Sequence, residues 1–162
     1  MKLLSIKTNL SIFILLFFVS LISCDSKPES QYKYEKDFKN YLSDVHNLNN
    51  NIINQIYYIV PLYSCSPCVD KNLKFLSSLN KIKNFKIILI GESSRKSHQS
   101  MVNSINKNHV TLFDKENKAQ FYELGLGKPI IIHFENEIPI HYQQIGDNQI
   151  NEIYDYFNKL EQ

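Results

Sequence analysis

The sequence lacks tryptophan and has only four glycines and three cysteines in 162 residues. Three cysteines cannot form a four-cysteine zinc site or a large disulfide framework. An excess of basic charge is also missing. Once Lys2 and Lys7 near the N-terminus are set aside, 16 basic residues remain against 16 acidic ones. A neutral body of this kind argues against nucleic-acid binding, which needs a basic face.

The composition is otherwise that of an ordinary globular domain. Hydrophobic residues make up 43% of the chain and charged residues 21%, which is near the average for folded soluble proteins and unlike disordered or fibrous chains. The length is sufficient for one domain of roughly 100–200 residues. We therefore expect a single folded domain behind any targeting segment.

Residues 1–23 are predicted to be an export signal. Lys2 and Lys7 give a positive start, and an apolar run over 12–22 follows, interrupted by Ser20. A membrane-spanning helix needs about 20 apolar residues, so this run is better explained as the core of a signal peptide.

The signal ends in the tetrapeptide Leu-Ile-Ser-Cys at Cys24, which resembles the lipobox of bacterial lipoproteins. The resemblance implies cleavage before Cys24, acylation of Cys24, and a body tethered to a membrane through the lipid anchor, outside the cytoplasm in the cell envelope. Several acyl chains would hold the protein there, since each buried methylene contributes ~0.8 kcal/mol. The alternative is an uncleaved anchor helix with Cys24 as an ordinary thiol.

The mature chain is predicted to have two parts. Residues 24–51 would form a lipidated tether and one amphipathic helix over about 31–47, whose apolar stripe is expected to pack against the domain. Residues 52–162 would form that domain. The stripe of the first part consists of Tyr34, Phe38, Tyr41, Leu42 and Val45.

Within 52–162, apolar runs of strand length alternate with helical periodicity. The pattern predicts an α/β fold with parallel crossovers and helices on both faces of the sheet. Pro139 removes a donor from the last strand, which is therefore expected at a sheet edge. Asp147 or Asn148 is expected to cap the last helix. The predicted strands are 52–62, 85–90, 110–114, 130–134 and 138–143, and the predicted helices are 66–80, 94–107, 119–124 and 147–161.

The motif that indicates chemistry is Cys65-Ser66-Pro67-Cys68, at a strand-to-helix junction. Two intervening residues on a first helical turn bring the two sulfurs close enough for a disulfide. The helix start favours negative charge, so the Cys65 thiol should have a lowered pKa, and a thiolate is the species that attacks disulfides. Cys68 lies one turn inside, where it can resolve a mixed disulfide. Pro67 suits a first helical turn.

With this motif, residues from about 52 to 161 resemble the thioredoxin-like superfamily, and most closely its envelope branch of TlpA-type thiol–disulfide oxidoreductases. The resemblance implies a thioredoxin-like α/β/α fold with a mixed central sheet, in which 94–114 is the branch's inserted helix and strand. It also implies that Pro129 is the cis-proline that presents backbone to substrate, and that Cys65 and Cys68 are the redox pair.

Three positions depart from the family pattern. Ser64 stands where most relatives have tryptophan before the first cysteine, and Tyr57, Tyr58 and Ile59 occupy the positions where many carry a buried acid. Lys128 precedes Pro129, where a small or β-branched residue is usual. If Pro129 faces the motif, Lys128 brings a cation near Cys65 that would favour its thiolate.

The sequence therefore predicts an envelope thiol–disulfide oxidoreductase that acts on protein thiols and disulfides without an organic cofactor or a metal. Ser66-Pro67 between the cysteines resembles the reducing members, which implies re-reduction by another thiol protein, such as a membrane electron donor. Alternatives on the same fold are an inert disulfide, a redox-inert adaptor, or a copper chaperone whose third ligand is His133 or His141. A peroxidase is disfavoured, because Leu62 stands where a threonine is needed. His46, His98 and His109 are expected at the surface or in loops.

Overall fold

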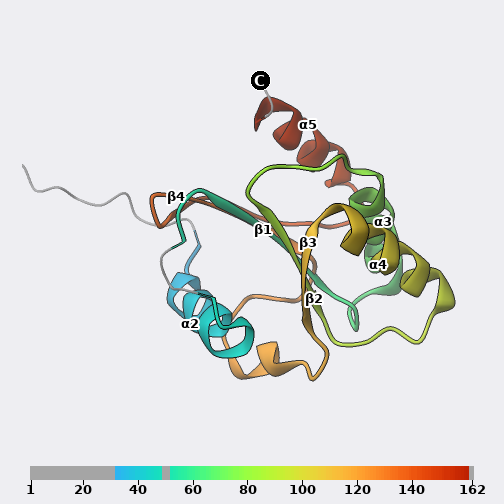
Figure 1. Cartoon of the computed structure of the whole chain (residues 1–162), viewed down its shortest axis with the longest axis horizontal. Coiled ribbons are helices and arrows are strands. Elements are labelled where there is room, and N and C mark those ends of the chain that lie inside the picture. The colour runs from blue at the N-terminus through green and yellow to red at the C-terminus, as the bar shows by residue number, and fades with distance from the viewer. Residues whose placement is uncertain (1–31, 49–51, 161–162) are drawn as a thin grey trace, which may run out of the picture.

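The computed structural model describes residues 32–48 and 52–160. The predicted signal peptide over 1–23, Cys24 and the tether up to residue 31 lie outside these residues. Four α-helices, five strands and one 3-10 helix follow each other along the described chain (Figure 1). In chain order they are α2 (Glu35–His46), β1 (Gln55–Pro61), α3 (Ser66–Ser78), β2 (Phe85–Ile90), α4 (Lys96–Asn108), β3 (Val110–Asp114), η1 (Lys118–Phe121), β4 (Ile130–Glu135), β5 (Ile138–Gln144) and α5 (Ile150–Leu160).

The five strands form one mixed sheet in the order β3-β2-β1-β4-β5. β1 pairs in parallel with β2, and β2 in parallel with β3, whereas β4 is antiparallel to both β1 and β5. β5 lies at the edge, as Pro139 predicts, and the pairing shifts register beside Phe134. A central β1 followed directly by a helix, with parallel β2 on one side and antiparallel β4 on the other, is the predicted thioredoxin-like arrangement.

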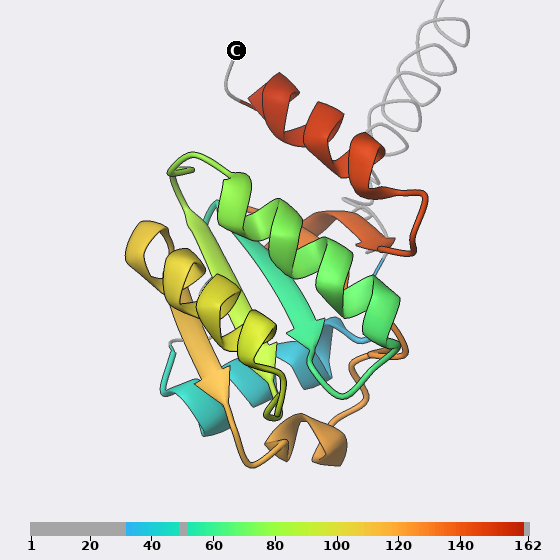
Figure 2. The ribbon, with the colours of Figure 1, turned by 90° about the vertical axis from the view of Figure 1, so that its right-hand side faces the viewer.

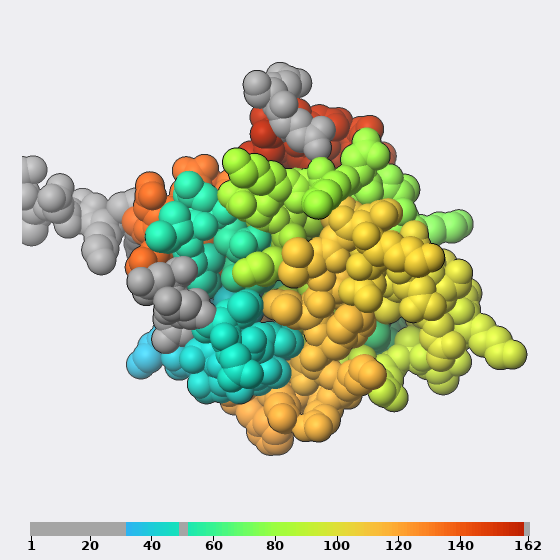
Figure 3. Space-filling view, viewed as in Figure 1, coloured from blue at the N-terminus to red at the C-terminus, as the bar shows by residue number. Residues whose placement is uncertain are grey.

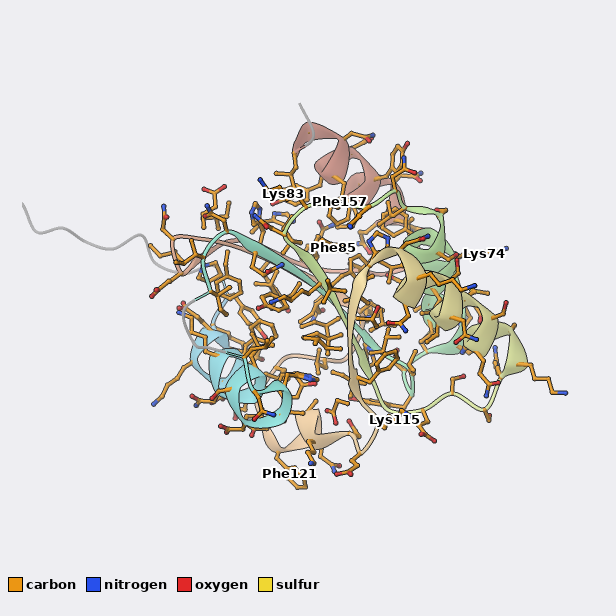
Figure 4. All side chains as sticks on the ribbon, viewed as in Figure 1. Lys74, Lys83, Phe85, Lys115, Phe121 and Phe157 are labelled. Carbon is orange, nitrogen blue, oxygen red and sulfur yellow. The ribbon has the colours of Figure 1, made fainter. Side chains whose placement is uncertain are left out.

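One face of the sheet, here called the redox face, is covered by α3, α4 and α5 (Figure 2). Alternate residues of β1 point to it, because successive side chains of a strand point to opposite faces. Phe85 and Phe157 meet edge to face, with their ring centroids 5.2 Å apart. Figure 4 labels both residues where β2 and α5 approach each other. The other buried residues of this face include Tyr58, Val60, Val69, Leu73, Leu76, Ile87, Leu89, Ile105, Ile131 and Ile153.

The opposite face, here called the α2 face, is covered by α2 with η1 beside it. Figure 3 shows these two segments side by side on the surface, in blue to cyan and in orange. Tyr122, just after η1, donates a hydrogen bond of 3.0 Å to the Asp44 carboxylate on α2. The core of this face is rich in aromatic rings, and residues of the α2 stripe are part of it. The predicted packing of that stripe against the domain is therefore confirmed. Its buried rings are Tyr32, Phe38, Tyr41, Tyr57 and Phe134.

Two expectations about polar residues are wrong. α5 begins only at Ile150, and the Gly146 N–H is bound by the Gln149 side chain (2.6 Å), so neither Asp147 nor Asn148 caps it. The conformation of the backbone, as well as the type of side chain, decides which residue stands at the N-cap of a helix. In α5 that residue is Gln149.

His98 and His109 are buried rather than exposed. His98 Nδ1 is hydrogen-bonded to the Ser93 hydroxyl (2.6 Å) and its Nε2 to the Asp70 carboxylate, which ties the start of α4 to α3. His109 lies against the Phe85 ring, 5.4 Å between centroids. Both residues sit in polar stretches of sequence, and only the tertiary packing covers them.

Within 32–48 and 52–160, no helix combines the length and the apolar character that crossing a membrane requires.

Candidate functional site

The two cysteines lie where β1 passes into α3. Cys65 immediately precedes α3 and is exposed, whereas Cys68 is on its first turn and only 7% exposed. Both are free thiols, and the Cys68 thiol donates to the Cys65 sulfur across 3.0 Å. This exposed first sulfur and covered second sulfur match the positions expected from the motif.

The local chain path follows from its sequence. β1 ends at Pro61, whose carbonyl accepts the Ser64 N–H at 3.0 Å and closes a turn. α3 then starts with Ser66 and Pro67, and its first hydrogen bond runs from the Val69 N–H to the Cys65 carbonyl (3.0 Å). Pro67 lacks an N–H, but the first N–H groups of a helix have no internal acceptor, so the proline costs no bond there.

The two thiols differ in acidity. Hydrogen bonds from the Cys68 side chain and backbone lower the pKa of Cys65, and the positive charge of Lys128 acts in the same direction. The hydrogen bond to Cys65, burial and the nearby Asp147 carboxylate raise the pKa of Cys68 to about 12. A thiol pair shares its protons, and here the pair's thiolate is favoured on Cys65, the exposed sulfur.

Lys128 is exposed, and its positive charge is the smallest of the influences on the pKa of Cys65. A Cβ on Gly146 would stand 3.7 Å from the Lys128 Nζ, so the amine is next to the loop that follows β5.

Pro129 follows Lys128 and leads into β4. Its carbonyl accepts the Ile145 N–H at 2.7 Å, which extends the β4–β5 pairing. No peptide bond within the described residues is cis, so the prediction of a cis bond at Pro129 is wrong for this structure. A trans bond is the ordinary preference of an X–Pro pair, by about 0.5–1 kcal/mol.

The positions where a buried acid is usual are filled by uncharged groups. Tyr58, on β1, donates its hydroxyl to the buried Asn72 side chain, and Asn72 Nδ2 in turn donates to the Cys68 carbonyl (2.7 Å). Beneath Cys68 there is thus a neutral hydrogen-bonded pair that holds the α3 backbone.

The sequence reasoning missed Asp147 as a site residue. Its carboxylate lies 3.6 Å from the Lys71 Nζ on α3, and its negative charge raises the pKa of both thiols. A signal was available in the strand order. β4 is antiparallel to β1, and β5 to β4, so β1 and β5 run in the same direction. The loops that follow them, which carry Cys65 and Asp147, therefore lie at the same end of the sheet.

The histidines considered for copper lie elsewhere. His133 pairs with Ile56 near the start of β1, whereas the cysteines follow its end. His133 Nδ1 binds the Tyr156 hydroxyl (2.6 Å), and His141 stacks on the same ring at 4.2 Å. In the part of the chain that the structure describes, no three His, Cys, Asp or Glu side chains gather to hold a metal ion. The structure thus gives no support to the copper alternative.

Comparisons with known proteins give distant likenesses only. No protein-family model matches the chain, and no curated protein matches it. Among solved structures, a secreted disulfide oxidoreductase of Mycobacterium tuberculosis, homologous to E. coli DsbE, aligns with a TM-score of 0.46 and 12% identity over 69% of this chain and 87% of that one.

Two further solved structures are similar to the same extent. A candidate thioredoxin of Neisseria meningitidis aligns with a TM-score of 0.44 and 15% identity, and a candidate thiol-disulfide oxidoreductase of Bacteroides vulgatus with 0.40 and 18%. Both alignments cover 67% of this chain and 75% of the other. Because these likenesses are distant, the function is inferred below from the chain's own residues.

Proposed function

We propose that the chain is a thiol–disulfide oxidoreductase that reduces protein disulfides in the bacterial cell envelope, tethered to a membrane through Cys24. The observation that carries the proposal is the pair of free thiols at the start of α3, one exposed and one buried, with sulfurs 3.0 Å apart. This is the geometry needed to form and break a disulfide with little movement of the chain.

Cys65 is the nucleophile in this proposal. Its thiolate attacks a substrate disulfide, one substrate sulfur leaves as a thiolate, and the other stays bound to Cys65. Cys68 then attacks Cys65, so the second substrate sulfur leaves and a Cys65–Cys68 disulfide forms. Two electrons have passed to the substrate, and a second thiol protein, which we take to be a membrane electron donor, restores the two thiols by the reverse exchange.

The surroundings of the pair suit a protein substrate. Tyr63, two residues before Cys65, has 53% of its surface exposed. It lines a cavity of about 420 Å³ together with Tyr34, Tyr122 and Leu126. Open aromatic surface beside a reactive thiol offers an extended peptide apolar contacts and ring edges. Lys128 and Pro129 precede β4 at the end of the sheet where β1 runs into the cysteines.

The activity is tested with a protein disulfide, such as that of insulin, and the purified domain in the presence of dithiothreitol. We expect reduction well above the rate with dithiothreitol alone, and mixed disulfides that accumulate with Cys68→Ser but not with Cys65→Ser. A stable Cys65–Cys68 disulfide that exchanges with no thiol would establish the inert alternative instead. The redox potential of the pair, measured against glutathione, decides between reductase and oxidase.

The tether is tested separately. Cys24→Ser should abolish palmitate labelling in cells and release the protein from the membrane fraction. If labelling persists in this variant, the lipid is elsewhere or absent, and the proposed anchor is wrong.

A further inference from the structure

A second group of polar side chains lies on the redox face, where α4 packs beside α3 (Figure 2). His98, on the first turn of α4, is only 3% exposed. Both nitrogens of its ring are hydrogen-bonded, Nδ1 to the Ser93 hydroxyl at 2.6 Å and Nε2 to the Asp70 carboxylate on α3. A serine, a histidine and a carboxylate are thus joined in one chain of hydrogen bonds.

The direction of these bonds follows from the chemistry of the three groups. A carboxylate has no proton to donate, so in the neutral ring Nε2 carries the N–H and Nδ1 is the acceptor. The Ser93 oxygen accepts the Arg95 N–H at 3.4 Å, and the proton of the hydroxyl is directed to Nδ1. His98 is therefore placed to receive a proton from Ser93, and the positive charge that results lies next to Asp70.

Ser93 and His98 also line a cavity of about 230 Å³, whereas Asp70, bound to the opposite nitrogen of the ring, does not. Part of the cavity wall is apolar, and Glu92 and Lys115, which Figure 4 labels, add one charge of each sign. The apolar residues are Leu62, Val102 and Phe113. A small, partly apolar cavity with no excess of either charge suits a small neutral acyl group.

A link between the two helices does not by itself explain this arrangement. Arg95 Nη1 lies 3.3 Å from the Asp70 carboxylate and already joins the segment before α4 to α3. Both side chains are about half exposed, so that ion pair contributes little to stability. What distinguishes His98 is its second bond, to a half-buried hydroxyl that lines the cavity. Joining the helices does not require that bond.

We propose that Ser93, His98 and Asp70 form a second catalytic site, separate from the cysteines, which hydrolyses small uncharged esters. His98 takes the proton of Ser93 as the serine oxygen attacks the carbonyl carbon of the ester. The bond to the alcohol breaks, the alcohol leaves with the proton held by His98, and the acyl group stays on Ser93. Water then attacks the acyl group while His98 takes its proton. The carboxylic acid leaves and that proton returns to the Ser93 oxygen, so atoms and protons balance.

Asp70 is a positioning residue in this scheme, because it contacts the ring of His98 and does not line the cavity. It keeps Nδ1 as the basic nitrogen and stabilises the ring while the ring is charged. Lys115 supplies a positive charge to the cavity, which stabilises the negative charge that develops on the carbonyl oxygen. Compared with serine proteases, the two ring nitrogens have exchanged partners, and the order of serine, histidine and carboxylate is the same.

The experiment first asks which residue reacts with a fluorophosphonate, a probe for activated serine hydroxyls. The purified protein is treated with iodoacetamide beforehand, so that Cys65 cannot react with the probe. Peptide mass spectrometry should then find a single phosphonylated residue, Ser93, and no adduct on heat-unfolded protein, because activation depends on the folded hydrogen-bond chain. Labelling of another serine, or no labelling under conditions that fully label a known serine hydrolase, would overturn the assignment.

Hydrolysis of 4-nitrophenyl acetate by the same thiol-blocked protein then tests the role of each residue. Ser93→Ala and His98→Gln should each lower kcat/KM by about 100-fold, at the lower end of the usual range for acid–base catalysis. Ser94→Ala makes the same change at the exposed neighbouring serine and should leave the rate unchanged. Asp70→Asn should lower kcat with little change in KM, and Asp70→Glu should recover part of the loss. Equal rates for Ser93→Ala and Ser94→Ala would contradict the proposal.

Two further measurements exclude unfolding and thiol chemistry as causes of these results. Ser93→Ala should unfold at the same urea concentration as the parent, and if it unfolds earlier, the position of the phosphonate adduct on the parent protein still decides. If iodoacetamide alone removes all ester hydrolysis from the parent, the activity belongs to Cys65 and the proposed serine site is wrong. Because the serine site does not use the cysteine pair, it can fail while the proposed disulfide chemistry stands.

Discussion

The two faces of the sheet have similar cores but differ in the chemistry they carry. Both bury aliphatic residues together with aromatic rings, four on the redox face and five on the α2 face. Only the redox face is covered by α3, which has both cysteines at its start. The α2 face carries none of the proposed reacting groups, so we expect activity and stability to be separable by mutation.

The largest expected effect is on the redox face. Cys65→Ser should reduce disulfide reduction to the rate of the added dithiol alone, because serine supplies no thiolate at neutral pH. The exposed side chain packs against little, so urea unfolding should show a change within about 0.5 kcal/mol. A large fall in unfolding free energy in this variant would show that Cys65 also supports the fold, so that activity and stability are not separable at this position.

The complementary change is Phe38→Ala on the α2 face. Phe38 is fully buried and contacts the Tyr57 and Phe134 rings at 5.2 and 6.0 Å. Truncation should cost about 3–5 kcal/mol of unfolding free energy, while the rate of Cys65 alkylation per folded molecule stays at the parent value. Phe121→Ala is the control, since that ring is 78% exposed and points away from the body in Figure 4, and it should change stability by less than about 0.5 kcal/mol.

A smaller effect is expected where the redox face holds a buried polar pair. Tyr58→Phe removes the hydroxyl that binds Asn72 and leaves the Asn72 oxygen buried without its donor. The expected cost is about 1–3 kcal/mol of unfolding free energy, against no change for Tyr154→Phe, whose ring is 53% exposed. Urea titrations give the unfolding free energy of both variants. Equal values for the two would show that the buried hydrogen bond contributes nothing to stability.

Removing the positive charge of Lys128 should have a still smaller effect, which is confined to the pKa of Cys65. Lys128→Met should raise the pKa of Cys65, because the lysine charge now lowers it, and the shift should shrink at high salt. The alkylation rate against pH measures it. Lys74→Met removes the same charge from an exposed position of α3 and should leave the profile in place. Overlapping profiles for Lys128→Met and the parent would show that Lys128 does not act on the thiol.

The smallest expected effect concerns acid stability. Burial lowers the pKa of His109, His133 and His141 on the redox side and of His46 on the α2 side, where the Asp114 charge partly offsets it. Below about pH 6.5 the unfolded chain binds protons that the folded chain does not, so stability falls as pH decreases. His46→Gln and His109→Gln should each flatten the fall in unfolding free energy between pH 7 and 5, measured by urea unfolding at the two pH values.

The sequence predicts the framework because its signals are local. Alternating side chains in β1, with Tyr57 on one face and Tyr58 on the other, specify a strand buried on both sides, and Pro139 excludes its strand from the sheet interior. The cysteine motif predicts a helix start, an exposed first sulfur and a covered second one. Each of these features depends on neighbours within a few residues.

What the sequence does not predict depends on distant segments. Asp147 is 79 residues beyond Cys68 in the chain, and an acidic residue before an amphipathic run predicts a cap wherever it occurs. Its ion pair with Lys71, on the helix that carries Cys68, exists only because β5 returns the chain to the end of β1. His98 and His109 are buried by α3 and by the Phe85 ring, which a polar stretch of sequence cannot reveal.

The contacts of α2 also have a consequence for the order in which the chain folds. Tyr32 donates its hydroxyl to the Leu124 carbonyl, 92 residues away, and Lys39 donates to the Glu137 carbonyl, 98 residues away. By contrast, paired residues of β1 and β2, such as Ile56 and Phe85, are only 29 residues apart in the chain, and closing a shorter loop costs less entropy. We therefore expect β1, α3 and β2 to associate first. Although α2 precedes these elements in the chain, it can pack only after β4 has completed its binding surface.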